Sequence, residues 1–310
     1  MIMRARSAAK VNLSLDIVGL RPNGYHELRS VVHTVGVWDE LELEIVPGGE
    51  EFALTCNRPE LETENNLCVR AAMLWKNLTG QKFGARLRLT KHIPSGAGLG
   101  GGSGNAAAVL LLLEAAFPDI AREFEAAPWR RQAATLGADV PLFLEGGCQL
   151  MEGIGEIISP LPALPGWLVI QKPERELSTP AVYRAWDVAA YSSHHDTNNL
   201  LAAIRGGVAP ASWAPRIGND LERPAQDLGL DVARELDRLR GTGAVAARMT
   251  GSGSATYAIF ATESEARAAS DTVHERLAKD VHDRSTKVWV APLVECGVSL
   301  AGGFERASGK

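Results

Sequence analysis

The feature that most constrains this chain is a glycine-rich stretch at residues 94–105. Six glycines occur from Gly96 to Gly104, and an alanine- and leucine-rich run follows at once, which predicts a helix over 106–117. Before the stretch, residues 85–90 alternate apolar and polar side chains, which predicts a half-buried strand. The order is therefore strand, proline, glycine loop and helix.

A loop of this kind can bind phosphate groups through its backbone. Glycines permit positive φ angles and let successive N–H groups approach a ligand. The N-terminus of the following helix adds unpaired N–H donors and a partial positive charge. Both features suit a di- or triphosphate, whereas a flexible linker rarely leads straight into a helix of this composition.

Two better-known phosphate motifs do not fit this stretch. Gly96, Gly98 and Gly101 satisfy the G-x-G-x-x-G spacing of dinucleotide-binding folds, but the preceding strand alternates where a buried parallel strand would be apolar throughout. No strand ending in an acidic residue follows about twenty positions later. A Walker loop ends in Gly-Lys-Ser/Thr, and no lysine follows these glycines. The remaining interpretation is a different phosphate loop, Pro-x-x-x-Gly-Leu-Gly-x-x-x-x-Asn-Ala-Ala, beginning at Pro94.

Length and composition narrow the class of protein. A chain of 310 residues suggests one large domain or two ordinary ones, and 45% hydrophobic with 22% charged residues is typical of a soluble globular protein. The net charge of −5 gives no general attraction to nucleic acid. Four widely spaced cysteines without a C-x-x-C motif indicate reduced thiols, and no signal-peptide or membrane-spanning run is seen. We therefore expect a cytoplasmic protein that binds neither nucleic acid nor a membrane.

Residues 8–18 alternate cleanly and predict a strand with one buried face. The apolar face holds Val11, Leu13, Leu15 and Ile17, and the other face holds Lys10, Asn12, Ser14 and Asp16. Taken alone, the pattern favours a polar face that meets water. The alternative is that Lys10 and Asn12 point into a cleft.

The rest of the chain predicts an α+β protein. A Pro-Asn-Gly turn at 22–24 places Tyr25 and His26 at a loop edge. Several antiparallel-type strands precede the glycine loop, which argues against a βαβ winding. The expected strands are 28–37, 39–46, 148–152, 156–160, 167–171, 287–293 and one on each side of a Gly-Ser turn at 250–254. The expected helices are 66–78 with Gly80 as its C-cap, 120–127, 128–136, one beginning at 179, 231–240 and 263–279, with a loose tail from about 302.

Asp139 is a single acid inside the apolar stretch 136–143. A buried Asp is unusual without a partner. One interpretation is a cap on a helix or turn, and the other is a catalytic carboxylate at a cleft.

Separated segments of this chain resemble the GHMP small-molecule kinases and, within them, the kinases of 4-diphosphocytidyl-2-C-methyl-D-erythritol. The segments that carry the resemblance are 9–13 with 24–26, 94–107, 136–141, 219–222 and 250–253. The resemblance implies two lobes with the active site between them, a mixed α/β nucleotide-binding lobe and a ferredoxin-like α+β lobe whose chain end returns toward the first. The implied division is 1–153 for the N-terminal domain, 154–293 for the C-terminal domain and 294–310 for a tail.

The same resemblance implies ATP as phosphate donor, Mg²⁺ as its companion and a cytidine-diphosphate methylerythritol as the small-molecule acceptor. Lys10 and Asp139 would flank the hydroxyl group that is phosphorylated. The implied ATP-binding residues are Asn66, Leu67, Lys91, Pro94, Gly96, Gly98, Leu99, Gly100, Gly101, Gly102, Ser103, Gly104 and Asn105. The implied acceptor-binding residues are Asn12, Tyr25, His26, Thr179, Pro180, Tyr183, Gly251, Ser252 and Gly253, with Tyr25 and Tyr183 sandwiching the cytosine and His26 bonding its edge.

One departure from the family pattern concerns the metal. The family commonly has Ser-Ser-Asn where this chain has Ser103-Gly104-Asn105, so the residues that would hold Mg²⁺ stay unassigned. Other acceptors within the superfamily, such as mevalonate, homoserine or a sugar, remain alternatives, as does a nucleotide-binding regulator without catalysis. Tyr25, His26 and Tyr183 favour an acceptor that carries a base. Nothing in the sequence implies a protein partner.

Overall fold

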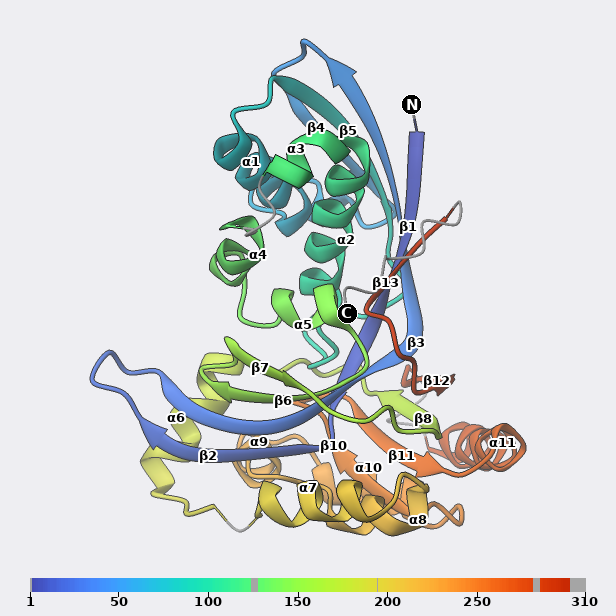
Figure 1. The fold of residues 1–310 in the computed structure, drawn as a ribbon. Coiled ribbons are helices and arrows are strands. Elements are labelled where there is room, and N and C mark those ends of the chain that lie inside the picture. The colour runs from blue at the N-terminus through green and yellow to red at the C-terminus, as the bar shows by residue number, and fades with distance from the viewer. Residues whose placement is uncertain (1, 124–127, 194, 281–284, 302–310) are drawn as a thin grey trace.

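A computed structural model describes residues 2–123, 128–193, 195–280 and 285–301. Its backbone is organised around one long strand, β3 (His26–Pro47), which runs from one lobe into the other (Figure 1). The first half of β3 pairs with β2 (Ser14–Leu20) and β6 (Cys148–Gly153). The second half pairs with β1 (Ile2–Asn12) and β5 (Phe83–Thr90).

The sequence predicted two strands where β3 is one. Trp38 is the β3 partner of Ala8, but Val35 is the partner of Ala9, so two extra residues lie on β3 at this point. An irregularity of this kind bends a strand without ending it. The apparent break in the sequence pattern is therefore a change of register inside one continuous strand.

Four shorter strands complete the large sheet. They are β4 (Phe52–Cys56) beside β5, β7 (Ile157–Pro160) beside β6, β9 (Gly218–Asn219) beside β2 and β13 (Val298–Leu300) beside β1. Residues 294–301, which the sequence assigned to a tail, thus reach the first lobe and add a strand to it, while 302–310 lie outside the described residues. The β6–β7 hairpin also crosses the expected boundary at residue 153, so that domain division stays a proposal.

A second sheet has four antiparallel strands, in the order β10 (Ala246–Met249), β11 (Thr256–Phe260), β8 (Trp167–Lys172) and β12 (Lys287–Pro292). Its two faces bury alternate residues of each strand. Leu168 and Ile170 pack with Val11 of the large sheet, whereas Val169 packs beneath α10 (Val232–Arg240) and α11 (Glu263–Lys279). This layering joins the second lobe to β1.

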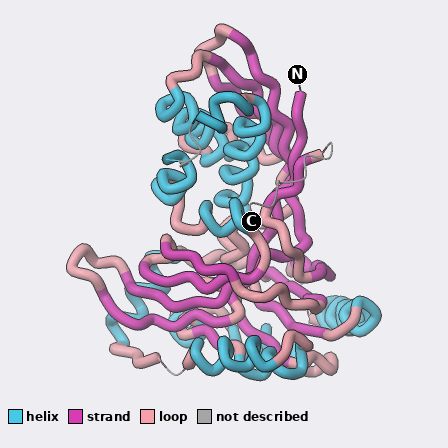
Figure 2. Tube along the Cα trace, in the orientation of Figure 1, coloured by secondary structure: helices cyan, strands magenta, loops and turns pink. Residues whose placement is uncertain are grey.

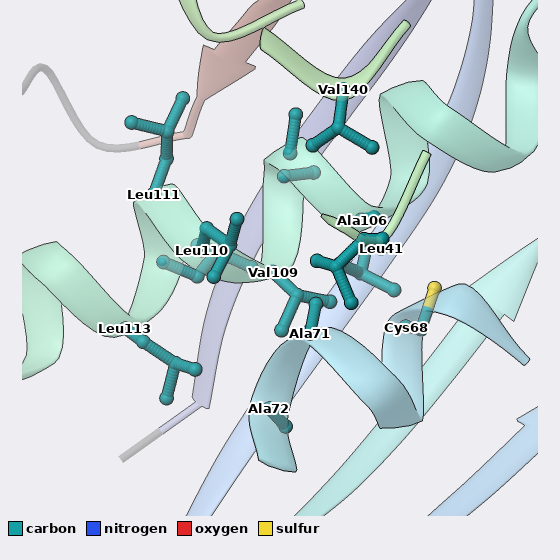
Figure 3. Packing of buried hydrophobic residues seen from close by; sticks show 14 of the residues in the cluster. Leu41, Cys68, Ala71, Ala72, Ala106, Val109, Leu110, Leu111, Leu113 and Val140 are labelled. Carbon is teal, nitrogen blue, oxygen red and sulfur yellow. The ribbon is translucent and has the colours of Figure 1, made fainter. Parts of the chain in front are cut away.

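Helix α2 (Gly101–Ala116) forms the centre of the first lobe. Residues 104–113 of α2 are all buried, as expected for a helix that is apolar on every side. Figure 3 shows Val109 of α2 close to Ala71 of α1 (Leu67–Thr79). The helix begins at Gly101, five residues before the predicted start, so its first turn is made from the glycine loop itself.

The other helices lie around these sheets (Figure 2). They are α3 (Pro118–Glu123), α4 (Pro128–Gln132), α5 (Val140–Glu145), α6 (Thr179–Ala189), α7 (Thr197–Gly206), α8 (Pro210–Trp213) and α9 (Glu222–Asp227), with short 3₁₀ turns at Pro59–Leu61, Ala133–Thr135 and Ala214–Arg216. The predicted helix 120–127 ends in residues that the structure does not describe. The α+β class is confirmed. No helix in the described parts of the chain has the length and apolar character needed to cross a membrane.

Candidate active site

The glycine loop and the first turn of α2 line one wall of a cavity of about 460 Å³. Gly100 is the N-cap, at a φ of +70°, and the first intrahelical bond runs from Gly104 N–H to its carbonyl at 3.0 Å. The amides of residues 101–103 therefore have no partner within the helix, and they form the donor set that binds anions at a helix N-terminus. All the predicted ATP-binding residues line this cavity except Gly104.

Gly104 is placed elsewhere for a steric reason. It packs against β1, and a Cβ atom at this position would lie 3.1 Å from the carbonyl oxygen of Ala8. The glycine thus permits close packing of α2 against the sheet.

A buried ionic network supports the same cavity from behind. Asp39 is fully buried, accepts hydrogen bonds from the backbone N–H groups of His92 and Ile93 at 2.7 and 2.8 Å, and forms an ion pair with Lys91. Asn105 donates to the same Asp39 carboxylate at 2.9 Å and accepts from Lys91 at 3.0 Å. Two of the implied ATP-binding residues, Lys91 and Asn105, are thus held by the carboxylate of Asp39, which the sequence alone did not indicate.

The polar face of β1 does not meet water, so the interpretation favoured by the pattern alone was wrong. Lys10 and Asn12 are each 6% exposed, and Ser14 and Asp16 of β2 are buried as well. The glycine loop covers this face at one point, where a Cβ atom on Gly100 would lie 2.9 Å from Lys10 Cγ. The Gly-Ser turn covers it at another, where the Thr250 hydroxyl lies 3.3 Å from Asn12 Oδ1.

Lys10 and Asp139 meet beside a second cavity of about 290 Å³. Lys10 Nζ lies 3.7 Å from Asp139 Oδ2, and the Asp139 side chain is 32% exposed. Asp139 stands at the N-cap position of α5, but its side chain makes no capping bond. The carboxylate is therefore directed to the lysine and the cavity, which favours the cleft interpretation over the capping one.

A third cavity, of about 470 Å³, collects the aromatic residues. It is lined by Tyr25, His26, Thr179, Pro180 and Tyr183, together with Gly24, Leu28, Ile154, Arg184 and Asp187. His26 stacks on Tyr183 with ring centroids 4.9 Å apart, and His26 Nε2 lies 2.7 Å from Asp187 Oδ1. Burial, with a further contribution from the charge of Asp139, raises the pKa of Tyr183, so its phenol stays neutral.

The placement of a cytosine ring between Tyr25 and Tyr183 stays a proposal. Tyr25 is 59% exposed at the rim, and the ring stacked on Tyr183 is that of His26. Of the Gly-Ser turn, Gly251 and Ser252 line the second cavity, and Gly253 does not. The Ser252 and Thr179 hydroxyls lie 2.8 Å apart, and Thr179 lines all three cavities.

No group of three His, Cys, Asp or Glu side chains in the described residues is arranged to hold a metal ion. Mg²⁺ is usually bound through one or two carboxylates, water and substrate phosphates. Asp139 lines the second cavity beside Gly98 and Gly100 of the glycine loop, and its side chain is 32% exposed.

Comparison with known proteins identifies the arrangement. Residues 66–147 match the GHMP kinases N terminal domain, and residues 212–279 match the GHMP kinases C terminal domain. A 4-diphosphocytidyl-2-C-methyl-D-erythritol kinase from Desulfitobacterium hafniense (strain Y51) is 37% identical over 93% of this chain and 95% of its own length. The chain belongs to the 4-diphosphocytidyl-2-C-methyl-D-erythritol kinase family.

Other relatives agree with this assignment. A kinase of the same name from Paracoccus denitrificans (strain Pd 1222) is 39% identical, covering 86% of this chain and 90% of its own. The crystal structure of a 4-(cytidine 5'-diphospho)-2C-methyl-D-erythritol kinase superposes with a TM-score of 0.77 at 33% identity, covering 97% of this chain and all of that one. The resemblance read from the sequence, and the two-lobed GHMP kinase fold that it implied, are confirmed.

Proposed function

We propose that this chain transfers the γ-phosphoryl group of ATP to the 2-hydroxyl group of 4-diphosphocytidyl-2-C-methyl-D-erythritol, a step of non-mevalonate isoprenoid biosynthesis. The observation that carries the proposal is the Lys10–Asp139 pair, whose groups lie 3.7 Å apart. The second cavity, which this pair lines, also contains Gly98 and Gly100 of the glycine loop and Tyr183 of the aromatic cavity. Donor and acceptor would therefore meet at this pair.

ATP is assigned to the first cavity. Its phosphates would accept hydrogen bonds from the backbone of residues 98–103, where the α2 N-terminus favours negative charge. Its adenosine would lie beside Asn66, Leu67, Lys91 and Asn105, which line the same cavity. Mg²⁺ would accompany the phosphates, neutralise their charge and complete its shell largely with water.

Asp139 is assigned as the base and Lys10 as the stabilising cation. Phosphoryl transfer depends mainly on positioning and charge stabilisation, with little covalent chemistry from the protein. A carboxylate within reach of the acceptor hydroxyl can take its proton, an effect typically worth about 10²–10⁴ in rate. Lys10 Nζ is held by Asn12 Oδ1 at 2.7 Å, so its charge is fixed beside the carboxylate and the transferring group.

The aromatic cavity is assigned to the cytosine ring. Stacking on Tyr183 accepts any base, since every base has a π face. The choice of cytosine would come from hydrogen bonds made by His26 and the nearby backbone. Because His26 now lies over Tyr183, base binding requires the His26 ring to move aside and Tyr25 to fold in from the rim.

The test is ADP release with Mg-ATP and a panel of acceptors: the cytidine-diphosphate methylerythritol, its uridine analogue, mevalonate and homoserine. We expect turnover with the cytidine compound and a loss of about 10²-fold or more in Asp139→Ala. Asp139→Asn, which keeps the shape without the charge, serves as the matched variant and should lose as much.

Three outcomes would change the proposal. Turnover with mevalonate or homoserine would keep the kinase and replace the acceptor. Equal turnover with the uridine analogue would remove the assigned base selection. ATP binding without turnover of any acceptor would indicate a nucleotide-binding regulator.

A further inference from the structure

Thr250 is a fully buried residue at the start of the Gly-Ser turn between β10 and β11. Its backbone is fixed on both sides by the second lobe. Thr250 N–H donates to the Ala255 carbonyl at 3.0 Å. The Asn219 side-chain amide donates to the carbonyls of Met249 and Gly251, at 2.9 and 2.8 Å, which flank Thr250 in sequence. The position of the Thr250 hydroxyl is therefore fixed by the contacts between Asn219 of β9 and the residues on either side of Thr250.

That hydroxyl contacts two segments from the first half of the chain. Its oxygen accepts a hydrogen bond from Asn12 N–H at 3.0 Å. It also lies 3.3 Å from Asn12 Oδ1 and 3.4 Å from the Gly98 carbonyl. A hydroxyl has one proton, so it donates to one of these two oxygens at a time. Either choice links the turn to β1 or to the glycine loop.

Asn12 carries this link on to the candidate catalytic pair. An ammonium group only donates, so the amide oxygen of Asn12 is the atom that faces Lys10, at 2.7 Å. The Asn12 amide nitrogen donates to Ser30 Oγ at 2.9 Å, which fixes the orientation of the side chain. The contacts thus run from Thr250 through Asn12 to Lys10.

The glycine loop packs against the turn backbone to backbone. A Cβ atom on Gly98 would lie 2.3 Å from the Thr250 carbonyl oxygen. Ala255 N–H also donates to the Ala97 carbonyl at 3.3 Å. Thr250 therefore stands where the loop, β1 and the turn meet.

We propose that Thr250 is a positioning residue, which fixes the Lys10 ammonium through Asn12 and holds the glycine loop in register with it. This inference rests on the proposed function, in which Lys10 stabilises the transferring phosphoryl group. Thr250 lines none of the three cavities, so we expect its hydroxyl to act mainly on the rate of transfer.

The experiment compares Thr250→Val, which keeps the shape and removes the hydroxyl, with Thr250→Ser, which keeps the hydroxyl. Thr256→Val is the matched control. Thr256 is equally buried, its hydroxyl accepts a hydrogen bond from the Gln171 side-chain amide at 3.0 Å, and it lines none of the three cavities. We expect kcat to fall about 10- to 100-fold in Thr250→Val, in line with loss of a buried hydrogen bond. KM for ATP should change by less than about threefold, and Thr250→Ser and Thr256→Val should keep kcat within about threefold.

A double-mutant cycle tests the route through Asn12. In an Asn12→Ala background, Thr250→Val should cost less in kcat than it does in the wild type, because the Asn12 Oδ1 contact is already lost while the contacts to the Asn12 N–H and the Gly98 carbonyl remain. Three results would overturn this inference and leave the proposed function standing, provided that the wild type turns over its acceptor. They are equal kcat values for Thr250→Val and Thr256→Val, a low kcat in Thr250→Ser, and full additivity of Thr250→Val with Asn12→Ala. If the wild type turns over no acceptor, the proposed function and this inference fail together.

Discussion

The first cavity, called the phosphate-side cavity here because we assign the ATP phosphates to it, and the aromatic cavity are built in opposite ways. The first is formed by backbone amides at the α2 N-terminus and supported by Asp39 and Asn105, which are 0% and 2% exposed. The aromatic cavity is formed by side chains, some of them near the surface: Tyr25 is 59% exposed and the Asp187 side chain is 44% exposed. One site is fixed by the fold, and the other is completed by rings that can turn.

This difference suits the two ligands that we assign to the cavities, the ATP phosphates and the cytosine ring. Phosphoryl transfer requires donors placed before the reaction, because reorganising them during the transfer would cost rate. Recognition of a base can use side chains that close on the ligand, because stacking tolerates small changes of position. Changes on the phosphate side should therefore affect the fold and the rate, whereas changes on the aromatic side should affect acceptor affinity.

The largest effect is expected from Gly98→Ala. Gly98 has a φ of +75°, and an added Cβ would lie 2.3 Å from the Thr250 carbonyl oxygen, a backbone atom that cannot turn away. We expect a loss of more than about 4 kcal/mol in unfolding free energy, measured by chemical denaturation, and no measurable ADP release.

Gly102→Ala is the control for the first prediction. Its Cβ would meet only Leu67 Cδ1, at 3.6 Å, and Gly102 lies in the first turn of α2. Alanine favours a helix over glycine by about 0.5–1 kcal/mol, so this variant should be at least as stable as the wild type. Equal stability of the two variants would contradict a rigid loop.

The second effect is expected from Asp39→Asn. The substitution leaves the Lys91 ammonium, whose side chain is 7% exposed, without its counter-charge. Breaking a buried ion pair on one side typically costs about 3–5 kcal/mol. We expect that loss in denaturant unfolding, together with a higher KM for ATP, because Lys91 and Asn105 both line the phosphate-side cavity.

Glu42→Gln provides the comparison for Asp39→Asn. Glu42 pairs with Arg4 at 2.7 Å, but the Arg4 side chain is 64% exposed, so water replaces the lost interaction. The unfolding midpoint and KM for ATP should both stay close to wild type. If Asp39→Asn changed the unfolding midpoint and KM for ATP as little as Glu42→Gln, the buried network of Asp39 would not be what stabilises the phosphate-side cavity.

The phosphate side was largely predictable from sequence because its information is local. The glycine loop, the proline before it and the helix after it are adjacent in the chain. The Gly80 cap of α1 was likewise predicted, whereas Asn66, expected as the first residue of that helix, is its N-cap. Asp39 was missed because it opens an alternating run with Glu40 and Glu42, in which an acid is usually a solvated residue. Its partner Lys91 is 52 residues away, and no period in the sequence reports a contact at that distance.

The polar face of β1 shows the same limit in another form. Alternation predicted correctly that Lys10 and Asn12 share a face opposite Val11 and Leu13. It could not predict what covers that face, because the covering segments come from the glycine loop and from a turn 238 residues away. Periodicity gives the direction of a side chain, and only the tertiary fold decides whether that direction leads to water.

The smallest effect is expected on the aromatic side, from Asp187→Ala. The substitution removes the 2.7 Å contact to His26 Nε2 and leaves the His26 ring, whose side chain is 9% exposed, with fewer restraints. Loss of one hydrogen bond of about 0.5–1.5 kcal/mol should raise KM for the cytidine acceptor by about tenfold or less, with KM for ATP unchanged. Asp187→Asn, whose amide oxygen can still accept from His26, should recover most of the affinity. Steady-state rates with each substrate varied in turn measure both constants, and a matching rise in KM for ATP would show that the two cavities are not separable as argued.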